Sequence, residues 1–259
     1  MSGARVDLPT TDGVMDVHTF QPQGKGPWPA VIIYMDAYGI RPDLDSMAQR
    51  LADAGYFVVV PNLYYRTRDF TSFDPRKIAA GDDAERTRFR AQIDSINNTL
   101  VMRDTEAVIA YLDTDTSESS GRPSGRPEPA VKPGKMGAVG YCMGGGFAIS
   151  ALGRFPDRVA AAASFHGGSL ATDKPDSPHR LAPQMRGTLY VGVAGIDPGF
   201  PKEQQDRLEA ALREAGVDYA LETYEGARHG FAVTGHMVYD RDASERHWHT
   251  LLDFFGRKL

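Results

Sequence analysis

The sequence is poor in cysteine, with Cys142 as the only one among 259 residues. An intramolecular disulfide is therefore impossible, and a reducing, cytoplasmic compartment is the natural expectation. No apolar run approaches the roughly 18 residues of a membrane span. The first residues also lack the apolar stretch of a secretory signal peptide. We therefore expect a soluble protein with no membrane partner.

An excess of positive charge is also missing. The net charge is -5 and the pI is about 5.8, so the composition gives no reason to expect a nucleic-acid partner. Hydrophobic residues make up 41% and charged residues 24%, an ordinary globular balance. No repeat of fixed period is visible, and a chain of this length can bury one large core. We expect a single domain over residues 1–259, and leave the oligomeric state open.

Apolar segments with strand and helix patterns alternate along the chain. Residues 4–20 alternate apolar and polar side chains around Asp12-Gly13, which indicates a β-hairpin. Short apolar runs typical of buried strands follow at 30–35, 56–60, 136–141, 159–165, 189–193 and 219–224. Helical spacing appears at 44–54, 91–112, 204–215 and 243–255, and 147–152 lies on a helix after its strand. This order predicts an α/β fold: a mostly parallel central sheet, helices on both faces and an antiparallel N-terminal edge.

Two segments carry weaker patterns. Residues 66–90 are charged and indicate a loop that leads into the helix at 91–112. Residues 113–135 are rich in Ser, Gly, Pro and charge, so we expect an exposed surface loop there, not a second domain.

The strongest motif is Gly140-Tyr141-Cys142-Met143-Gly144, between a predicted strand and a predicted helix. It matches the G-x-S-x-G nucleophile elbow with cysteine in place of serine. A sharp strand-to-helix turn crowds the backbone, so the flanking positions must be small. The helix N-terminus favours a thiolate at Cys142, and the amide of Met143 is placed to donate to an oxyanion. The competing interpretation is a small buried cysteine at a glycine-rich packing contact.

A cysteine nucleophile needs a base and an orienting acid, and in this fold they follow it in the order acid, base. His229 comes after the last predicted strand, where active sites of open α/β sheets lie. His166 also follows a strand, but it precedes every good acid candidate. We choose Asp197, at the end of the strand TLYVGVAGID, as the acid. Glu222 and Glu225 are the alternatives.

Cofactor and metal signatures are weak. His247 and His249 are two apart on a predicted helix and point to different sides. Ile149 stands where a dinucleotide fingerprint after Gly144 needs glycine, and Gly134-Lys135 lacks the phosphate-loop spacing. We expect no cofactor and no metal.

With these residues in place, the sequence resembles the dienelactone hydrolase (carboxymethylenebutenolidase) family over nearly its whole length. The similar segments are MDAYGI, LADAGYFVVVPNLYYR, GYCMGGG, SFHGG, VAGID and RHGF. The resemblance implies an α/β-hydrolase fold with a Cys–His–Asp triad of Cys142, His229 and Asp197. It also implies Ala37 as a second oxyanion amide. The expected activity is hydrolysis of a small ester or lactone through an acyl-thioenzyme.

The sequence departs from the family pattern at three places. Asp36 stands where the family has a glutamate that contacts and activates the thiol, so its reach is shorter. Val233 stands where a basic residue would bind a substrate carboxylate. Arg86 is the nearest match to the family's other carboxylate-binding arginine, with Arg88 or Arg90 as alternatives. The substrate is therefore open between dienelactone and other esters and lactones. A non-catalytic ligand-binding protein on the same fold is the alternative function, and a redox-sensing thiol protein ranks last because no second cysteine is present.

Overall fold

The structure is a computed structural model that describes residues 3–67, 70–71, 73–116 and 130–259. Its centre is an eight-stranded sheet in the order β1-β2-β4-β3-β5-β6-β7-β8. The strands are β1 (Ala4–Thr10), β2 (Gly13–Phe20), β3 (Ala30–Tyr34), β4 (Phe57–Pro61), β5 (Met136–Tyr141), β6 (Val159–Phe165), β7 (Thr188–Ile196) and β8 (Tyr219–Arg228). The six strands from β3 to β8 run parallel, which confirms the predicted fold class.

The antiparallel edge is the predicted hairpin. Strands β1 and β2 pair through a turn in which Thr10 lies opposite Gly13, and β2 then pairs antiparallel with β4. Gly13 has a φ of 144°, which a residue with a side chain rarely adopts. The hairpin buries Leu8, Met15 and Val17 against the core. Residues 17–20 of β2, which pair with β4, are all buried, so both faces of the hairpin are covered there.

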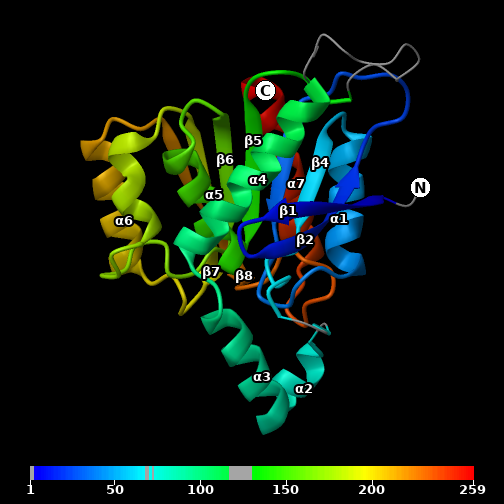
Figure 1. The fold of residues 1–259 in the computed structure, drawn as a ribbon. Coiled ribbons are helices and arrows are strands. Elements are labelled where there is room, and N and C mark those ends of the chain that lie inside the picture. Colours follow the sequence, from blue (N-terminus) through cyan, green and yellow to red (C-terminus); the bar gives the residue numbers. More distant parts are fainter. Residues whose placement is uncertain (1–2, 68–69, 72, 117–129) are drawn as a thin grey trace.

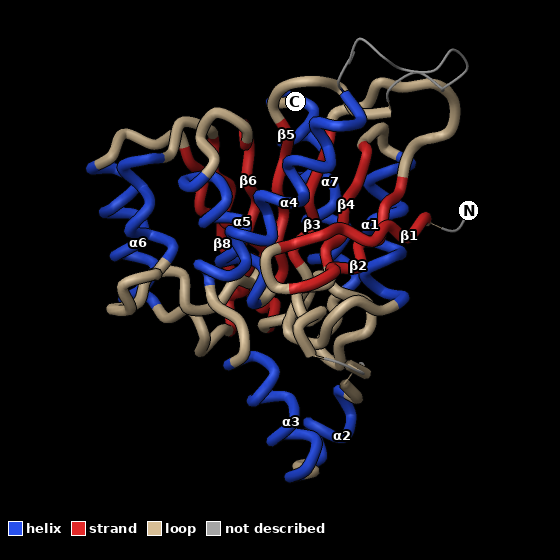
Figure 2. Tube along the Cα trace, in the orientation of Figure 1, coloured by secondary structure: helices blue, strands red, loops and turns tan. Residues whose placement is uncertain are grey.

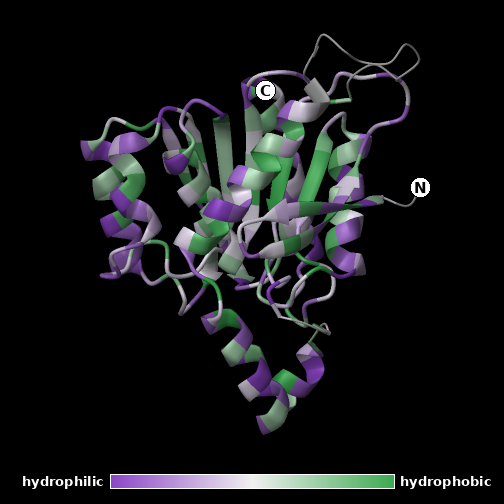
Figure 3. Ribbon diagram, in the orientation of Figure 1, coloured by the Kyte–Doolittle hydropathy of each residue, from purple (hydrophilic) through white to green (hydrophobic). Residues whose placement is uncertain are grey.

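Helices cover both faces of the sheet (Figure 1). They are α1 (Pro42–Asp53), α2 (Pro75–Ala80), α3 (Asp83–Asp94), α4 (Asn98–Thr116), α5 (Met143–Arg154), α6 (Lys202–Glu214) and α7 (Arg241–Lys258), with a 3-10 helix η1 (Pro178–Gln184). In the view of Figure 1, α4 and α5 lie in front of the sheet, and α1 and α7 lie behind it. The central strands are green in the hydropathy colouring of Figure 3, and purple concentrates on the outer helices and loops. The parallel strands are buried on both faces, which explains their continuous apolar runs.

The helix predicted over residues 91–112 is two helices in the structure. Helix α3 ends at Asp94 and α4 begins at Asn98. The hydroxyl of Ser95 donates to the carbonyl of Gln92, and the side chain of Asn97 accepts from the amide of Leu100. These side chains satisfy the helix ends and terminate the first helix.

The segment expected to be a loop over residues 66–90 also contains helices. Asp74 and Asp82 cap α2 and α3, since their carboxylates accept from the amides of Arg76 and Glu85. Figures 1 and 2 show that α2 and α3 project from the body at the end where α4 begins.

The predicted loop at 113–135 is partly regular. Helix α4 runs to Thr116, and Val131 is buried and forms a bridge with Trp28. Residues 117–129 of this loop lie outside the described part of the chain, so its exposure there stays a prediction.

Candidate active site

The polar residues of interest follow the ends of neighbouring parallel strands. Cys142 comes directly after β5, His166 after β6, Asp197 after β7 and His229 after β8. The strand register aligns them: Tyr141 is opposite Phe165, and Ile196 is opposite Arg228. Because parallel strands end at one edge of a sheet, four segments far apart in sequence meet there.

The turn after β5 has the geometry of a nucleophile elbow. Cys142 has φ 54° and ψ −118° at the start of α5, a strained backbone that costs about 1–3 kcal/mol for a non-glycine residue. A Cβ on Gly140 would lie 1.9 Å from the carbonyl oxygen of Gly144. A Cβ on Gly144 would lie 2.2 Å from the carbonyl oxygen of Tyr34. Both glycines of the motif are therefore required by direct backbone contact.

The structure brings Cys142, His229 and Asp197 together. The Nε2 atom of His229 lies 3.1 Å from the sulfur of Cys142, and its Nδ1 lies 2.7 Å from Oδ2 of Asp197. Burial alone would lower the pKa of His229, but hydrogen bonds to Asp197 and Cys142 outweigh it and raise the pKa to about 10. The geometry suits proton transfer from the thiol to an imidazole that a carboxylate orients.

The two expected oxyanion donors share a neighbour, since the hydroxyl of Tyr64 contacts both the Ala37 carbonyl and the sulfur of Met143. Met143 is the first residue of α5, and Ala37 follows β3. Among the described residues, no protein hydrogen bond engages the amide of either. The loop that carries Ala37 is held by a hydrogen bond, because the hydroxyl of Tyr64 donates to the Ala37 carbonyl at 2.9 Å. The oxyanion role of the two amides stays a prediction.

The carboxylate of Asp36 is fully buried and already has its partners. Its two oxygens accept from Nη1 and Nη2 of Arg41, each at 2.7 Å. It also accepts from Nε2 of His236 at 3.0 Å and from the amide of Tyr38 at 2.9 Å. Burial alone would raise the pKa of Asp36, but the hydrogen bonds from His236 and Arg41 hold it well below its usual range. Within the described residues, none of its hydrogen bonds goes to the Cys142 sulfur.

Arg86, the predicted carboxylate-binding residue, lies on the projecting helix α3. Its Nε donates to the carbonyl of Ile78 at 2.9 Å, which ties α3 to α2. The alternative Arg88 donates to Glu85 and to the carbonyl of Thr71. No contact of Arg86 in the described structure joins it to the Cys142–His229 pair. Its role in substrate binding stays a prediction.

Sequence reasoning missed the partners of the central residues. Arg41 and His236 were not proposed as site residues, and no motif marks them, because their contacts with Asp36 form only in the folded chain. His166 was weighed as a base, but its Nδ1 accepts the amide of Cys142 at 3.2 Å. It therefore supports the elbow from the neighbouring strand.

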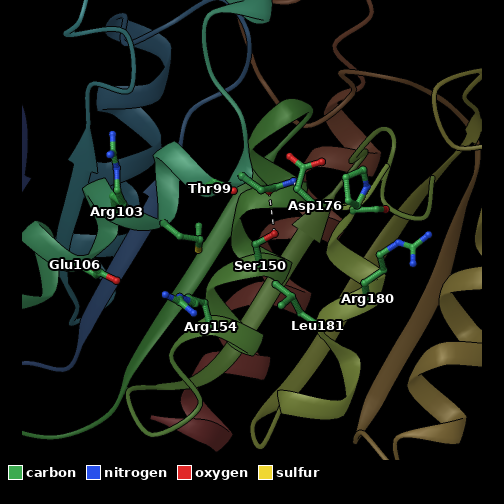
Figure 4. Close-up of a pocket in the computed structure, with 12 residues that line it drawn as sticks. Thr99, Arg103, Glu106, Ser150, Arg154, Asp176, Arg180 and Leu181 are labelled. Atoms are coloured by element: carbon green, nitrogen blue, oxygen red, sulfur yellow. Dashed lines mark hydrogen bonds between the residues drawn. The ribbon is translucent and has the colours of Figure 1, made fainter. Parts of the chain in front are cut away.

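Figure 4 shows a separate pocket of about 290 Å³ on the flank of α5. It lies between α4, α5 and η1, and Ser150, Arg154 and Leu181 are among its lining residues. The hydroxyl of Ser150 donates to the side chain of Asn98 at 2.9 Å. None of Cys142, His229 and Asp197 lines this pocket.

The sequence profile of the dienelactone hydrolase family matches residues 15–259. The chain belongs to the dienelactone hydrolase family. A "Putative carboxymethylenebutenolidase" from Synechocystis sp. is 27% identical over 259 residues, covering 98% of this chain and 96% of the relative. A carboxymethylenebutenolidase from Rhodococcus opacus is 26% identical over 254 residues, covering 97% and 89%. The family is one of hydrolases of the ester and lactone type, with small-molecule substrates.

Solved structures show the same fold. A crystal structure of a "Putative Dienelactone Hydrolase" from Klebsiella pneumoniae aligns with a TM-score of 0.80 at 19% identity, covering 98% of each chain. Within the described residues, no helix combines the length and apolarity that a membrane crossing requires. The same part of the chain contains no cluster of three or more His, Cys, Asp or Glu side chains suited to hold a metal ion.

Proposed function

We propose that this member of the dienelactone hydrolase family cleaves small esters or lactones with Cys142 as nucleophile, His229 as base and Asp197 as orienting acid. One observation carries the proposal: the chain's only thiol sits on a strained elbow, 3.1 Å from an imidazole held by a carboxylate. A buried packing cysteine would not need that alignment.

The first half of the reaction forms an acyl-thioenzyme. The thiol proton of Cys142 passes to Nε2 of His229, and the sulfur attacks the substrate carbonyl, forming a carbon–sulfur bond. The carbonyl electron pair becomes an oxyanion, which the amides of Met143 and Ala37 stabilise. The pair then re-forms the carbonyl and expels the alkoxide, which takes the proton from His229. For a lactone the leaving alkoxide stays on the same molecule.

The second half releases the acid. Water gives a proton to His229 and attacks the thioester carbonyl, and collapse of the second tetrahedral intermediate breaks the carbon–sulfur bond. The sulfur recovers its proton from His229, and a carboxylic acid leaves. No step needs a cofactor. A thiol nucleophile must stay unoxidised, which agrees with the reducing, cytoplasmic compartment that we expect.

Asp36 acts on this chemistry indirectly in our proposal. Its charge is already balanced by Arg41 and hydrogen-bonded by His236. Asp36 therefore modulates the Cys142 thiol through the electric field of the Asp36–Arg41–His236 group, without a direct contact.

The test is a panel of p-nitrophenyl esters and unsaturated lactones. We expect turnover by the wild type, loss of turnover in Cys142→Ala and His229→Ala, and full activity in the control His249→Ala, whose histidine is exposed on α7. Acid quenching during turnover should leave the acyl mass on the peptide that contains Cys142. Saturable binding of these compounds without turnover by the wild type would instead support the non-catalytic ligand-binding alternative.

A further inference from the structure

Strand register places a second side chain against the nucleophile. Because Tyr141 and Phe165 are partners in β5 and β6, the next residues, Cys142 and His166, leave the sheet side by side. Both have a positive φ, 54° and 41°. Each is a non-glycine residue in a region that costs about 1–3 kcal/mol. Two adjacent strands therefore both end in a residue with positive φ, at the same edge of the sheet.

The two residues are joined by a hydrogen bond that fixes the form of the imidazole. The amide of Cys142 donates to Nδ1 of His166 at 3.2 Å, and it also donates to the carbonyl of Phe165 at 3.2 Å. An acceptor Nδ1 carries no proton, so the proton of a neutral ring is on Nε2. Among the described residues, that Nε2 has no hydrogen-bond partner. In the described part of the chain, the bond from the Cys142 amide is thus the hydrogen bond that this ring makes.

The surroundings of His166 keep it neutral. It is fully buried, and its ring centre lies 5.4 Å from His229 and 6.5 Å from His236. Burial and the charges of these two histidines hold the pKa of His166 well below its usual range, although Asp36 opposes them. A protonated Nδ1 could not accept the amide of Cys142. The ring therefore remains an acceptor while His229 gains and loses its proton.

We propose that His166 is a positioning residue, whose imidazole accepts the Cys142 amide and holds the nucleophile in its positive-φ conformation with the sulfur aligned on His229. The expected effect on kcat rests on the proposed function. The hydrogen bond to His166 and its effect on the position of the Cys142 sulfur do not. Without the imidazole acceptor, the Cys142 amide keeps one hydrogen bond, to the Phe165 carbonyl, and the strained elbow is less well fixed. The sulfur then samples positions away from the imidazole.

Two substitutions at His166 separate the effect of the hydrogen-bond acceptor from the effect of packing. In His166→Asn the side-chain oxygen can take the place of Nδ1, whereas His166→Leu fills the space without an acceptor. We expect His166→Leu to lower kcat about tenfold, the equivalent of one hydrogen bond of roughly 1.4 kcal/mol, with KM within about twofold. We expect His166→Asn to stay within about threefold of the wild type.

Alkylation of Cys142 by iodoacetamide, followed from pH 5 to 10, gives a second readout that needs no substrate. The rate reports how well the Cys142 sulfur is coupled to His229. His236, Asp36 and His247 are the other titratable groups that act on His166. We expect the midpoint of the rate profile to move upward in His166→Leu and to stay in place in His166→Asn. Melting temperatures show that both variants are folded.

The outcomes are distinct. Equal kcat and equal alkylation profiles in His166→Leu and His166→Asn would reduce His166 to a packing residue and overturn the inference. A folded wild type without turnover on any ester or lactone would sink the proposed function, while the alkylation profiles would still decide the role of His166. If both variants fail to fold, the ring ¹⁵N chemical shifts of His166 in the wild type decide. A proton on Nε2 and none on Nδ1 supports the bond from the Cys142 amide, and a proton on Nδ1 contradicts it.

Discussion

The strongest prediction for stability concerns the buried pair of Asp36 and Arg41. Replacing Arg41 by methionine keeps much of the apolar stem and removes the guanidinium that donates to both carboxylate oxygens. Breaking a buried ion pair from one side usually costs about 3–5 kcal/mol, because the other charge stays buried without compensation. We expect the lower end, about 3 kcal/mol, since His236 still donates to the carboxylate.

The chain contains a matched control at its surface. Arg50 also donates through two nitrogens to one carboxylate, that of Glu245, but these side chains are 41% and 52% exposed. For Arg41 and Asp36 the corresponding values are 9% and 0%. Solvent screens the exposed pair, so Arg50→Met should cost at most about 1 kcal/mol. The two variants remove the same chemical group from the same two-nitrogen contact with a carboxylate. Arg41 differs in its burial and in a further hydrogen bond, from its Nη1 to the carbonyl of Gly39 at 3.1 Å.

Urea unfolding at pH 7 measures the loss of free energy of unfolding in both variants, with a common dependence on urea concentration (m) for all of them. The double variant Asp36→Asn/Arg41→Met should recover more than half of the loss, because no buried charge is left. The pKa of Asp36 is lowered by folding, so its contribution is present above its unfolded pKa and is lost as the pH falls through the folded one. The gap between wild type and Arg41→Met in the free energy of unfolding should therefore narrow as the pH falls below 3.8, the ordinary value for Asp. Equal losses in Arg41→Met and Arg50→Met at pH 7 would refute this reasoning.

Three further predictions follow from the geometry. Asp197→Asn should lower kcat about 100-fold or more, because His229 loses its orienting carboxylate. Stopped assays on the best ester measure kcat, and an unchanged value would exclude Asp197 as the acid. Gly140→Ala should give no folded protein, since its Cβ would lie 1.9 Å from a backbone oxygen, whereas Gly146→Ala, with its nearest atom at 3.5 Å, should melt near the wild type. Burial lowers the pKa of His247 to about 3. The unfolded histidine takes up a proton near pH 6.5, so the wild type should lose stability as the pH falls from 6.5 towards 3. Urea midpoints across that range should fall less steeply in His247→Gln.

The parts of the fold that the sequence predicted are those with local causes. Parallel strands are buried on both faces, so β5 and β6 appear as continuous apolar runs with the bounds that the structure has. The elbow was recognisable because steric crowding leaves only glycine at its flanking positions. By contrast, apolar spacing continued across residues 95–97, where side-chain hydrogen bonds end α3, so the helix break was missed.

The missed residues of the candidate site have long-range causes. Arg41 meets Asp36 five residues away, but His236 meets it across 200 residues of chain. His166 bonds to a backbone amide 24 residues earlier. Such contacts leave no periodicity and no local motif, because they depend on which strands become neighbours. The three central residues were predictable only through chain order and the ends of strands.

The assembly of the site from successive strand ends has a consequence for the folding of the chain. The elbow has its contacts with β3, β5, β6 and the start of α5, but Asp197 and His229 follow β7 and β8, the last two strands in the sequence. Long-range parallel pairing is slow to form, and translation delivers these strands last. A nascent or truncated chain can therefore display its only thiol before the base exists. Under the proposed mechanism, hydrolysis begins only after β7 and β8 have joined the sheet, because these strands position Asp197 and His229.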